Sequence, residues 1–396
     1  MTNHALLTTI ENDSHIRILS GYEKLQLLVR RKTVSGRLFI KVKKILSAVV
    51  AGFLALGSLT ACNAAGAKGN NKLQIVTTIF PEYDWVMNVL GDTASNADVT
   101  MLLDNGVDLH SFQPTAADIM KISSCDLFIY VGGESDDWVE DALKEAVNKD
   151  MIVINLMNEL GDAVKEEELV EGMQGEDEEE HDHDDHDEDH DHEEHDHDDD
   201  HDHDEDHDHE HHHHEGEIEY DEHVWLSLKN AQVLVKSISD ALQKIDSANA
   251  DAYKKNADAY IEALKALDAE YKAAVDAASN KTILFGDRFP FRYMVDDYGL
   301  TYYAAFVGCS AETEASFETI TFLSKKVDEL SLPAIFTIEG KDKRIAETIS
   351  QNTSTKDQKI LTLDSMQSVS SSDIKNGTTY MSIMENNLSV LKEALK

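Results

Sequence analysis

Three things are scarce in this sequence of 396 residues: basic residues, cysteines and long hydrophobic runs. Against 77 Asp and Glu there are 35 Lys and Arg, a formal charge of −42, so nothing in the chain would displace counterions from a nucleic acid. Only one apolar run is long enough to consider as a membrane span, which excludes a polytopic membrane protein. With 41% hydrophobic residues the chain can build a core, so full disorder is excluded too.

The three cysteines, Cys62, Cys125 and Cys309, are too few for a disulfide framework. The sequence contains no Cys-x-x-Cys pair, so thioredoxin-type chemistry and a thiolate zinc site find no support in it. We therefore expect Cys125 and Cys309 to be buried as small hydrophobic residues rather than to form a disulfide with each other.

The acidic excess is concentrated in one segment. Residues 176–219, the His-rich tract, hold 27 Asp or Glu, no Lys or Arg, and 15 of the 19 histidines. Such a composition has nothing to bury, so we expect a disordered loop spanning about 166–219. Alternating His and Asp offer many weak zinc sites, which suggests a zinc collector or a sensor of zinc supply. A solvated spacer and an affinity tag are the alternatives.

The N-terminal region has the pattern of an export signal. A basic Lys-Val-Lys-Lys segment precedes an apolar stretch of about 17 residues that ends in Leu59-Thr-Ala-Cys62. We expect residues 1–61 to be a leader with a lipoprotein signal peptide, Cys62 to be lipidated, and 62–71 to be a linker. A single transmembrane anchor is the alternative. Both place the body of the protein outside the cytoplasmic membrane, attached to it.

The remaining chain alternates strand-like and helical segments in two similar series. This pattern predicts an α/β fold with mostly parallel sheets in two lobes, an N-terminal lobe over 72–225 and a C-terminal lobe over 280–396. Residues 226–279 contain two amphipathic helical segments and are expected to form a stiff link between the lobes. The strand-like runs are 73–79, 99–103, 127–131, 152–156, 282–285, 302–307, 334–338 and 360–363, and a last helix is expected near 380–395.

Outside the leader and the tract only two histidines remain, His110 and His223. A lone histidine in a core is usually structural, but the settings of these two point to a site. His110 follows the second strand-like run, where loops carry binding groups. His223 lies directly before the linking helices. We therefore take both as candidate metal ligands.

These residues lie in motifs that resemble one family, the substrate-binding lipoproteins of zinc and manganese ABC importers. The first motif is Gly-x-x-x-His-Ser-Phe-x-Pro-Thr-x-x-Asp around His110, and the second is Asp-x-His-x-Trp-x-Ser around His223. Leu109 and Glu222 replace the usual residues before the two histidines. The resemblance spans residues 72–396 apart from the tract, and includes Val-Gly-Gly-Glu134, Trp138 and Tyr298-Gly-Leu300.

The resemblance implies two lobes joined by a rigid helix, with the metal held in the cleft by two ligands from each lobe. His110 and His223 map onto the ligands of the first lobe, and Asp364 maps onto the fourth ligand. Such a protein is not an enzyme. It would be a monomer that captures Zn²⁺, with Mn²⁺ as the alternative, and passes it to an ABC permease and ATPase complex. Imidazole and carboxylate ligands suit either ion, and the tract favours zinc.

The third ligand position departs from the family pattern. Arg288 occupies it, and a guanidinium is always protonated and cannot bind a metal. We expect the neighbouring Asp287 to supply the ligand, with Arg288 turned toward a carboxylate. Glu339 or a water molecule is the alternative.

Two other classes of function compete with transport. A secreted zinc hydrolase would use Glu222 beside His223 as a general base, but the sequence has no His-Glu-x-x-His motif and no nucleophile elbow. An adhesin or a surface metal buffer is the other alternative.

Overall fold

The computed structural model describes residues 72–175, 219–310, 314–340 and 342–396. Lys72–Lys396 form one compact unit of the chain. The expected leader and signal peptide, the lipidation site Cys62, the linker 62–71 and all of the His-rich tract except Glu219 lie outside the described residues. Within the described ranges, no helix combines the length and apolar character that crossing a membrane requires.

The first lobe is built on a parallel sheet in the order β2-β1-β3-β4. Parallel neighbours need a crossover between them, and helices fill that role here. The strands are β1 (Leu73–Thr77), β2 (Ala97–Met101), β3 (Leu127–Tyr130) and β4 (Ile152–Asn155). The α-helices are α3 (Phe80–Leu90), α4 (Ala116–Ser124), α5 (Trp138–Lys144) and α6 (Leu156–Leu160). Short 3-10 helices are η1 (Gly91–Asn96), η2 (Leu109–Ser111), η3 (Glu134–Asp136), η4 (Gly161–Ala163) and η5 (Val224–Leu226).

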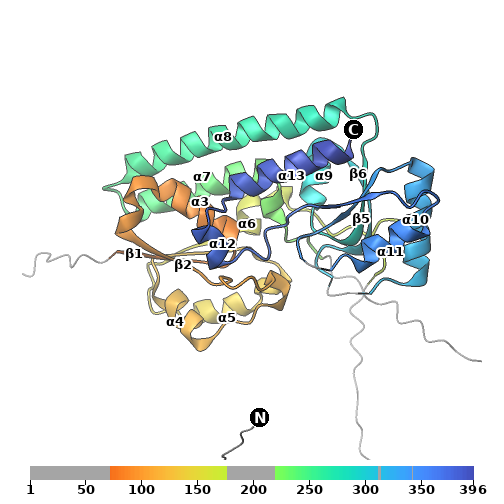
Figure 1. Cartoon of the computed structure of the whole chain (residues 1–396). Coiled ribbons are helices and arrows are strands. Elements are labelled where there is room, and N and C mark those ends of the chain that lie inside the picture. The colour runs from red at the N-terminus through yellow and green to blue at the C-terminus, as the bar shows by residue number, and fades with distance from the viewer. Residues whose placement is uncertain (1–71, 176–218, 311–313, 341) are drawn as a thin grey trace, which may run out of the picture. The chain divides into compact units, whose positions relative to one another are not determined.

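The second lobe repeats this topology with a parallel sheet in the order β6-β5-β7-β8. Its strands are β5 (Thr282–Phe289), β6 (Thr301–Val307), β7 (Ala334–Thr337) and β8 (Lys359–Thr362). Its helices are α9 (Arg292–Tyr298), α10 (Phe317–Leu330) and α11 (Arg344–Asn352). Helix α12 (Ser371–Lys375) follows β8 in the chain but lies beside β2 of the first lobe (Figure 1), where the Ser371 amide donates to the Asp104 carbonyl at 2.7 Å. The prediction of two α/β lobes with parallel sheets is confirmed. Strand β5 is longer than expected, with a register shift between Phe285 and Arg288, so Asp287 lies within it.

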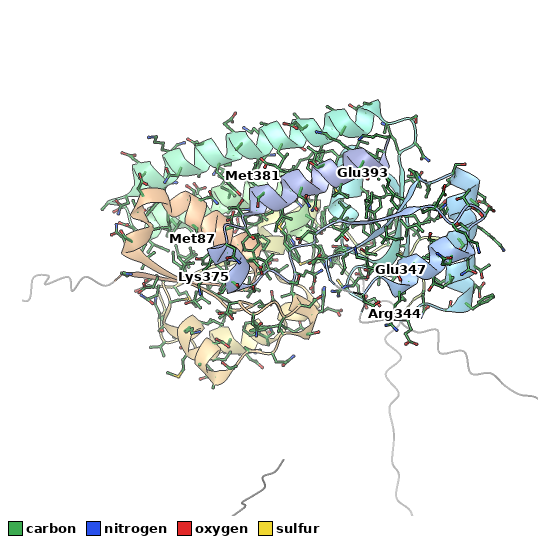
Figure 2. The ribbon with its side chains drawn as sticks, in the orientation of Figure 1. Met87, Arg344, Glu347, Lys375, Met381 and Glu393 are labelled. Atoms are coloured by element: carbon green, nitrogen blue, oxygen red, sulfur yellow. The ribbon has the colours of Figure 1, made fainter. Side chains whose placement is uncertain are left out.

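Two long helices link the lobes, α7 (Leu228–Ile245) and α8 (Ala250–Ala277). The Ser227 side chain caps α7 by accepting a hydrogen bond from the amide of Asn230. The last helix, α13 (Tyr380–Ala394), runs beside α8 (Figure 1), and Met381 and Glu393 mark its two ends in Figure 2. The Tyr271 hydroxyl on α8 donates to the Met384 carbonyl of α13 at 2.6 Å. The C-terminal segment therefore packs on the linking helices.

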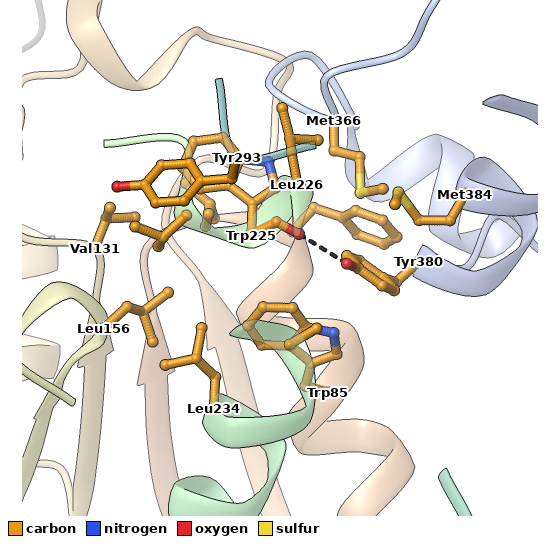
Figure 3. Packing of buried hydrophobic residues seen from close by; sticks show 14 of the residues in the cluster. Trp85, Val131, Leu156, Trp225, Leu226, Leu234, Tyr293, Met366, Tyr380 and Met384 are labelled. Atoms are coloured by element: carbon orange, nitrogen blue, oxygen red, sulfur yellow. Dashed lines mark hydrogen bonds between the residues drawn. The ribbon is translucent and has the colours of Figure 1, made fainter. Parts of the chain in front are cut away.

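One continuous hydrophobic core connects the two lobes. At its centre the Tyr380 hydroxyl donates to the Trp225 carbonyl at 2.7 Å, and the ring of Tyr380 meets that of Trp85 edge-on (Figure 3). The indole nitrogen of Trp225 donates to the Ser365 carbonyl at 2.9 Å. Trp225 belongs to η5 of the first lobe and Ser365 follows β8 of the second, so this hydrogen bond joins the two lobes. Trp225 is only two residues from His223 in the sequence.

A buried carboxyl group at the start of α3 makes the stability of this fold depend on pH. Glu82 is fully buried, and one of its oxygens accepts hydrogen bonds from the amides of Thr78 and Ile79. Burial, with the negative charge of Asp136, raises the pKa of Glu82 to about 8.

Replacing Glu82 with Gln is expected to reduce the amount by which the free energy of unfolding falls as pH rises. The folded state holds the Glu82 proton up to about pH 8, whereas the unfolded state releases it near the ordinary pKa of about 4.3. Between these values the free energy of unfolding of the wild type falls by up to about 1.4 kcal/mol per pH unit through this group. Chemical denaturation of both proteins from pH 5 to 8 would show Glu82→Gln gaining relative stability with pH. A constant difference between them would contradict the assignment.

Candidate metal centre

His110 is held by its backbone and by one ring nitrogen. It lies on η2, where the N-cap residue Asp108 accepts a hydrogen bond from the His110 amide at 3.1 Å. Its Nδ1 lies 2.8 Å from the Ser135 hydroxyl and 3.5 Å from Oε2 of Glu222. With Nδ1 engaged on this side, the ring presents Nε2 to the interior of the site.

Glu222 supports His110 from behind, and a glycine makes room for it. Its Oε1 accepts a hydrogen bond from the Ser135 amide at 2.9 Å. Gly133 has a φ of +80°, and a Cβ there would lie 2.3 Å from Oε1 of Glu222. Only glycine fits this left-handed, close-approach position. The residue that departs from the family motif thus has a structural role beside the histidine.

His223 is fully buried and, like His110, has a hydrogen-bonding partner at Nδ1. Asp221 Oδ1 accepts hydrogen bonds from the His223 amide at 2.8 Å and from its Nδ1 at 3.1 Å. Because a carboxylate only accepts, Nδ1 is the protonated nitrogen and Nε2 faces the other way. The ring of Trp225 packs against that of His223, with centroids 5.2 Å apart. Both histidines therefore have a partner on Nδ1 that fixes the direction of Nε2.

The two Nε2 atoms face one another at hydrogen-bonding distance, with Nε2 of His110 3.3 Å from Nε2 of His223. Two nitrogens that each bind a tetrahedral Zn²⁺ at about 2.0–2.1 Å lie about 3.3–3.4 Å apart. Burial, with the positive charge that His223 carries when protonated, lowers the pKa of His110 well below its usual range. The His110 lone pair is therefore available to a metal at neutral pH, and the spacing of the pair fits zinc.

The third member of this group is Cys309, at the turn after β6. One ligand atom from each of His110, His223 and Cys309 lies within 4.8 Å of the others, and among the described residues these three form the one such group. The expectation that Cys309 is simply a buried hydrophobic residue is wrong, because the chain brings its half-buried thiol to the histidines. Cys125 is buried as expected, and the two cysteines form no disulfide.

The predicted carboxylate ligands do not join this group. Asp287 Oδ2 accepts from the amide of Ile338 at 3.2 Å, and Asp364 Oδ1 accepts from the amide of Met366 at 2.8 Å. Burial and the charge of Glu339 raise the pKa of Asp364 to about 7. Glu339 itself accepts hydrogen bonds from the amides of Ser365 and Gln367. All three carboxylates thus accept hydrogen bonds from backbone amides in loops of the second lobe.

Arg288 pairs with a carboxylate, as its charge requires. Its guanidinium forms an ion pair with Asp108, the residue that caps η2 beneath His110. The residue at the family's third ligand position therefore ties the second lobe to the His110 loop.

A cavity of about 550 Å³ leads to the histidine–cysteine group. Its lining includes His110 and Cys309, and its acidic groups favour the entry of cations. The carboxylates in the lining are Glu134, Asp137, Glu167, Glu219 and Glu222. Glu219 is the last residue of the His-rich tract, so the tract rejoins the described fold at this cavity.

The structure consists of two α/β lobes with parallel sheets, linked by helices. Side chains from distant parts of the chain meet in a group of a kind that binds metals. These features define a two-lobed metal-binding protein. The chain belongs to the family described as zinc-uptake complex component A, periplasmic, whose model matches residues 75–394. The resemblance drawn from the histidine motifs is thereby confirmed.

Two curated relatives and one solved structure illustrate the likeness. The zinc-binding lipoprotein AdcA of Streptococcus pneumoniae is 31% identical over 356 residues, 89% of this chain and 61% of that protein. The high-affinity zinc uptake system protein ZnuA of Bacillus subtilis is 30% identical over 341 residues, 86% of this chain and 93% of that protein. The Zn(II)-bound ZnuA-like domain of pneumococcal AdcA has a TM-score of 0.58 and 28% identity, covering 82% of this chain and 99% of the domain.

The chain spans a little over half of the length of several of the streptococcal relatives that it matches, 56% for AdcA of Streptococcus pyogenes. These relatives therefore contain regions that the matched part of the chain does not cover.

Proposed function

We propose that this protein is the zinc-binding receptor of an ABC importer, which captures Zn²⁺ outside the cytoplasmic membrane and delivers it to a permease and ATPase complex. The observation that carries the proposal is the pair of Nε2 atoms 3.3 Å apart, a separation that suits one tetrahedral zinc ion. The family membership and the zinc-binding relatives support the same function.

In this proposal His110 and His223 are the first two ligands. The second lobe offers two sources for the remaining coordination. One is the pair of predicted carboxylates, Asp364 from the family pattern and Asp287 as the neighbour of Arg288, and the other is the thiol of Cys309. Zinc is favoured over manganese because imidazole and thiolate are softer ligands than carboxylate, and a manganese receptor remains the alternative if carboxylates complete the site.

The proposal includes attachment to the membrane through a lipid on Cys62 and a monomeric receptor. The apolar segment that ends in Leu59-Thr-Ala-Cys62 supports the lipid anchor, and the pneumococcal relative is named a lipoprotein. Transfer to the permease would then occur at the membrane surface, by a shift between loaded and empty conformations rather than by chemistry.

A hydrolase is less consistent with the position of Glu222. A general base must reach the water that a metal activates. The side chain of Glu222 instead lies on the Nδ1 side of His110, with one oxygen accepting from the Ser135 amide. This carboxylate therefore supports the histidine at Nδ1, whereas the metal would bind at Nε2.

Deleting residues 176–218 is expected to remove several weak zinc sites and to leave one tight site. The deletion retains Glu219, whose carbonyl accepts a hydrogen bond from the Glu167 amide at 2.9 Å. The full-length protein and the deletion variant, both purified without added metal, would be compared by metal analysis and then by calorimetric titration with Zn²⁺. Unchanged stoichiometry would contradict the collector role of the tract.

A tight site in the deletion variant that disappears with His110→Ala would assign it to the described group. Loss of all zinc binding with the tract would instead contradict a receptor site in the fold. Transport itself is tested by growth of a strain that lacks the whole gene for this protein. This strain should fail to grow in zinc-chelated medium, and normal growth would favour the adhesin or metal-buffer alternative.

A further inference from the structure

We propose that the thiolate of Cys309 is the third protein ligand of the metal, so that two imidazoles and one sulfur hold it. This inference rests on the proposed function and specifies the site that performs it. Its basis is the group of His110, His223 and Cys309, whose ligand atoms lie within 4.8 Å of one another. Zn–S and Zn–N bonds of about 2.3 and 2.0–2.1 Å place sulfur and nitrogen ligands about 3.6 Å apart in a tetrahedral site, so small side-chain adjustments suffice.

The loop that carries Cys309 approaches His223 at a glycine. A Cβ on Gly308 would lie 2.9 Å from the Phe289 carbonyl oxygen and 3.1 Å from Cε1 of His223. Such contacts are too short for an ordinary side chain to enter without displacing the backbone or the imidazole. Gly308 thus permits the approach that brings the next residue, Cys309, beside the histidine.

The position of Cys309 is also fixed by a carboxylate from the first part of the chain. The Cys309 amide donates to Oε1 of Glu167 at 3.1 Å, and the Ser310 amide closes the turn onto the Val307 carbonyl. Cys309 is therefore held by an ordered turn at the carboxyl end of β6. Binding of Zn²⁺ would replace the S–H bond by a Zn–S bond and release one proton to solvent.

Cys309 and His110 both line the cavity of about 550 Å³. A metal bound by them and by His223 has three protein ligands, which leaves the fourth coordination position to water from that cavity. A site with an open position exchanges its metal more readily than a closed four-ligand site. Sulfur among the ligands discriminates against Mn²⁺, which prefers oxygen.

The test uses Co²⁺ as a spectroscopic substitute for Zn²⁺ in the tract-containing protein. A Co²⁺–thiolate bond gives an intense sulfur-to-metal charge-transfer absorption in the near ultraviolet, and the tract contains no cysteine. The wild type is expected to show this absorption at one equivalent. Cys309→Ser should lose it and bind Zn²⁺ about 10²-fold more weakly in competition with a chelator. Cys125→Ala is the matched control, because Cys125 is a second free cysteine that is buried elsewhere in the first lobe.

The competing carboxylate site is tested by Asp364→Asn and Asp287→Asn, which should change zinc affinity by less than about threefold. Tight zinc binding without the charge-transfer absorption, together with a large loss of affinity in either Asn variant, would overturn the thiolate ligand and leave the receptor function standing. Failure of the wild type to bind any Zn²⁺ tightly would overturn the receptor function itself. Because the absorption is measured on the wild type, the test does not depend on correct folding of Cys309→Ser.

Discussion

Replacing His223 with Ala is expected to weaken tight zinc binding by about 10²–10³-fold. A tight zinc site contributes roughly 10–16 kcal/mol in total, so the loss of one of its ligands removes about 3–4 kcal/mol, which corresponds to that factor. His223 is fully buried, and its Nε2 lies 3.3 Å from that of His110. No neighbouring nitrogen in the described group could take its place. Competition titration with a chelator would measure the change.

Zinc-dependent stabilisation provides a second measure of the same effect. A ligand that binds only the folded state stabilises it by about 4 kcal/mol at a thousand times its Kd. The wild type should therefore unfold at a higher temperature with Zn²⁺ than with EDTA, and His223→Ala should lose this difference. His195→Ala, which removes one of the 15 tract histidines, is the matched control and should retain it. Equal stabilisation of His223→Ala and the wild type would contradict a ligand role for His223.

Much of the fold could be predicted from the sequence because it follows from local patterns. Buried strands separated by helices leave a strong signature, and a crossover between parallel strands demands a helix. Both sheets and the linking helices could be predicted in this way. The packing of α13 on α8 was not, since it depends on tertiary contacts such as the hydrogen bond from Tyr271 to Met384, for which periodicity carries no information.

The candidate metal site could be predicted only in part from the sequence, for a related reason. His110 and His223 are conspicuous because the body of the chain contains no other histidine, and both lie in recognisable motifs. Cys309 lies in no motif that identifies it as a ligand. The absence of a Cys-x-x-Cys pair excludes only local thiolate sites, whereas this thiol approaches two histidines from distant parts of the chain. The one available signal was its place just after a strand-like run, the same kind of position that His110 occupies.

The support for the histidines was equally hidden in the sequence. Glu222 stands out there as a departure from the family motif and as a possible catalytic base. In the structure it accepts from the Ser135 amide and lies behind His110, and Gly133 creates the space for it. Residues that orient metal ligands are identified by such contacts, and a motif alone cannot distinguish them from catalytic groups.

Replacing Trp225 with Ala is expected to lower the free energy of unfolding by about 3–5 kcal/mol, the range for truncating a buried aromatic residue. Trp225 is 1% exposed and links the lobes through its hydrogen bonds with Ser365 and Tyr380. The same substitution should weaken zinc binding, because the indole packs against the His223 ring and holds it in the direction of His110. Chemical denaturation in EDTA measures the first effect and chelator competition the second.

Two milder variants separate the causes of this loss. Trp225→Phe keeps a ring beside His223 but leaves the Ser365 carbonyl without the indole donor, at a cost of about 1–3 kcal/mol. Tyr380→Phe removes only the hydroxyl that donates to the Trp225 carbonyl and should cost about as much. If packing against His223 positions the imidazole, zinc affinity should fall in the order Tyr380→Phe, Trp225→Phe, Trp225→Ala. Equal zinc affinity in all three variants would show that Asp221 alone, through its bonds to the His223 amide and Nδ1, is sufficient to orient the ligand.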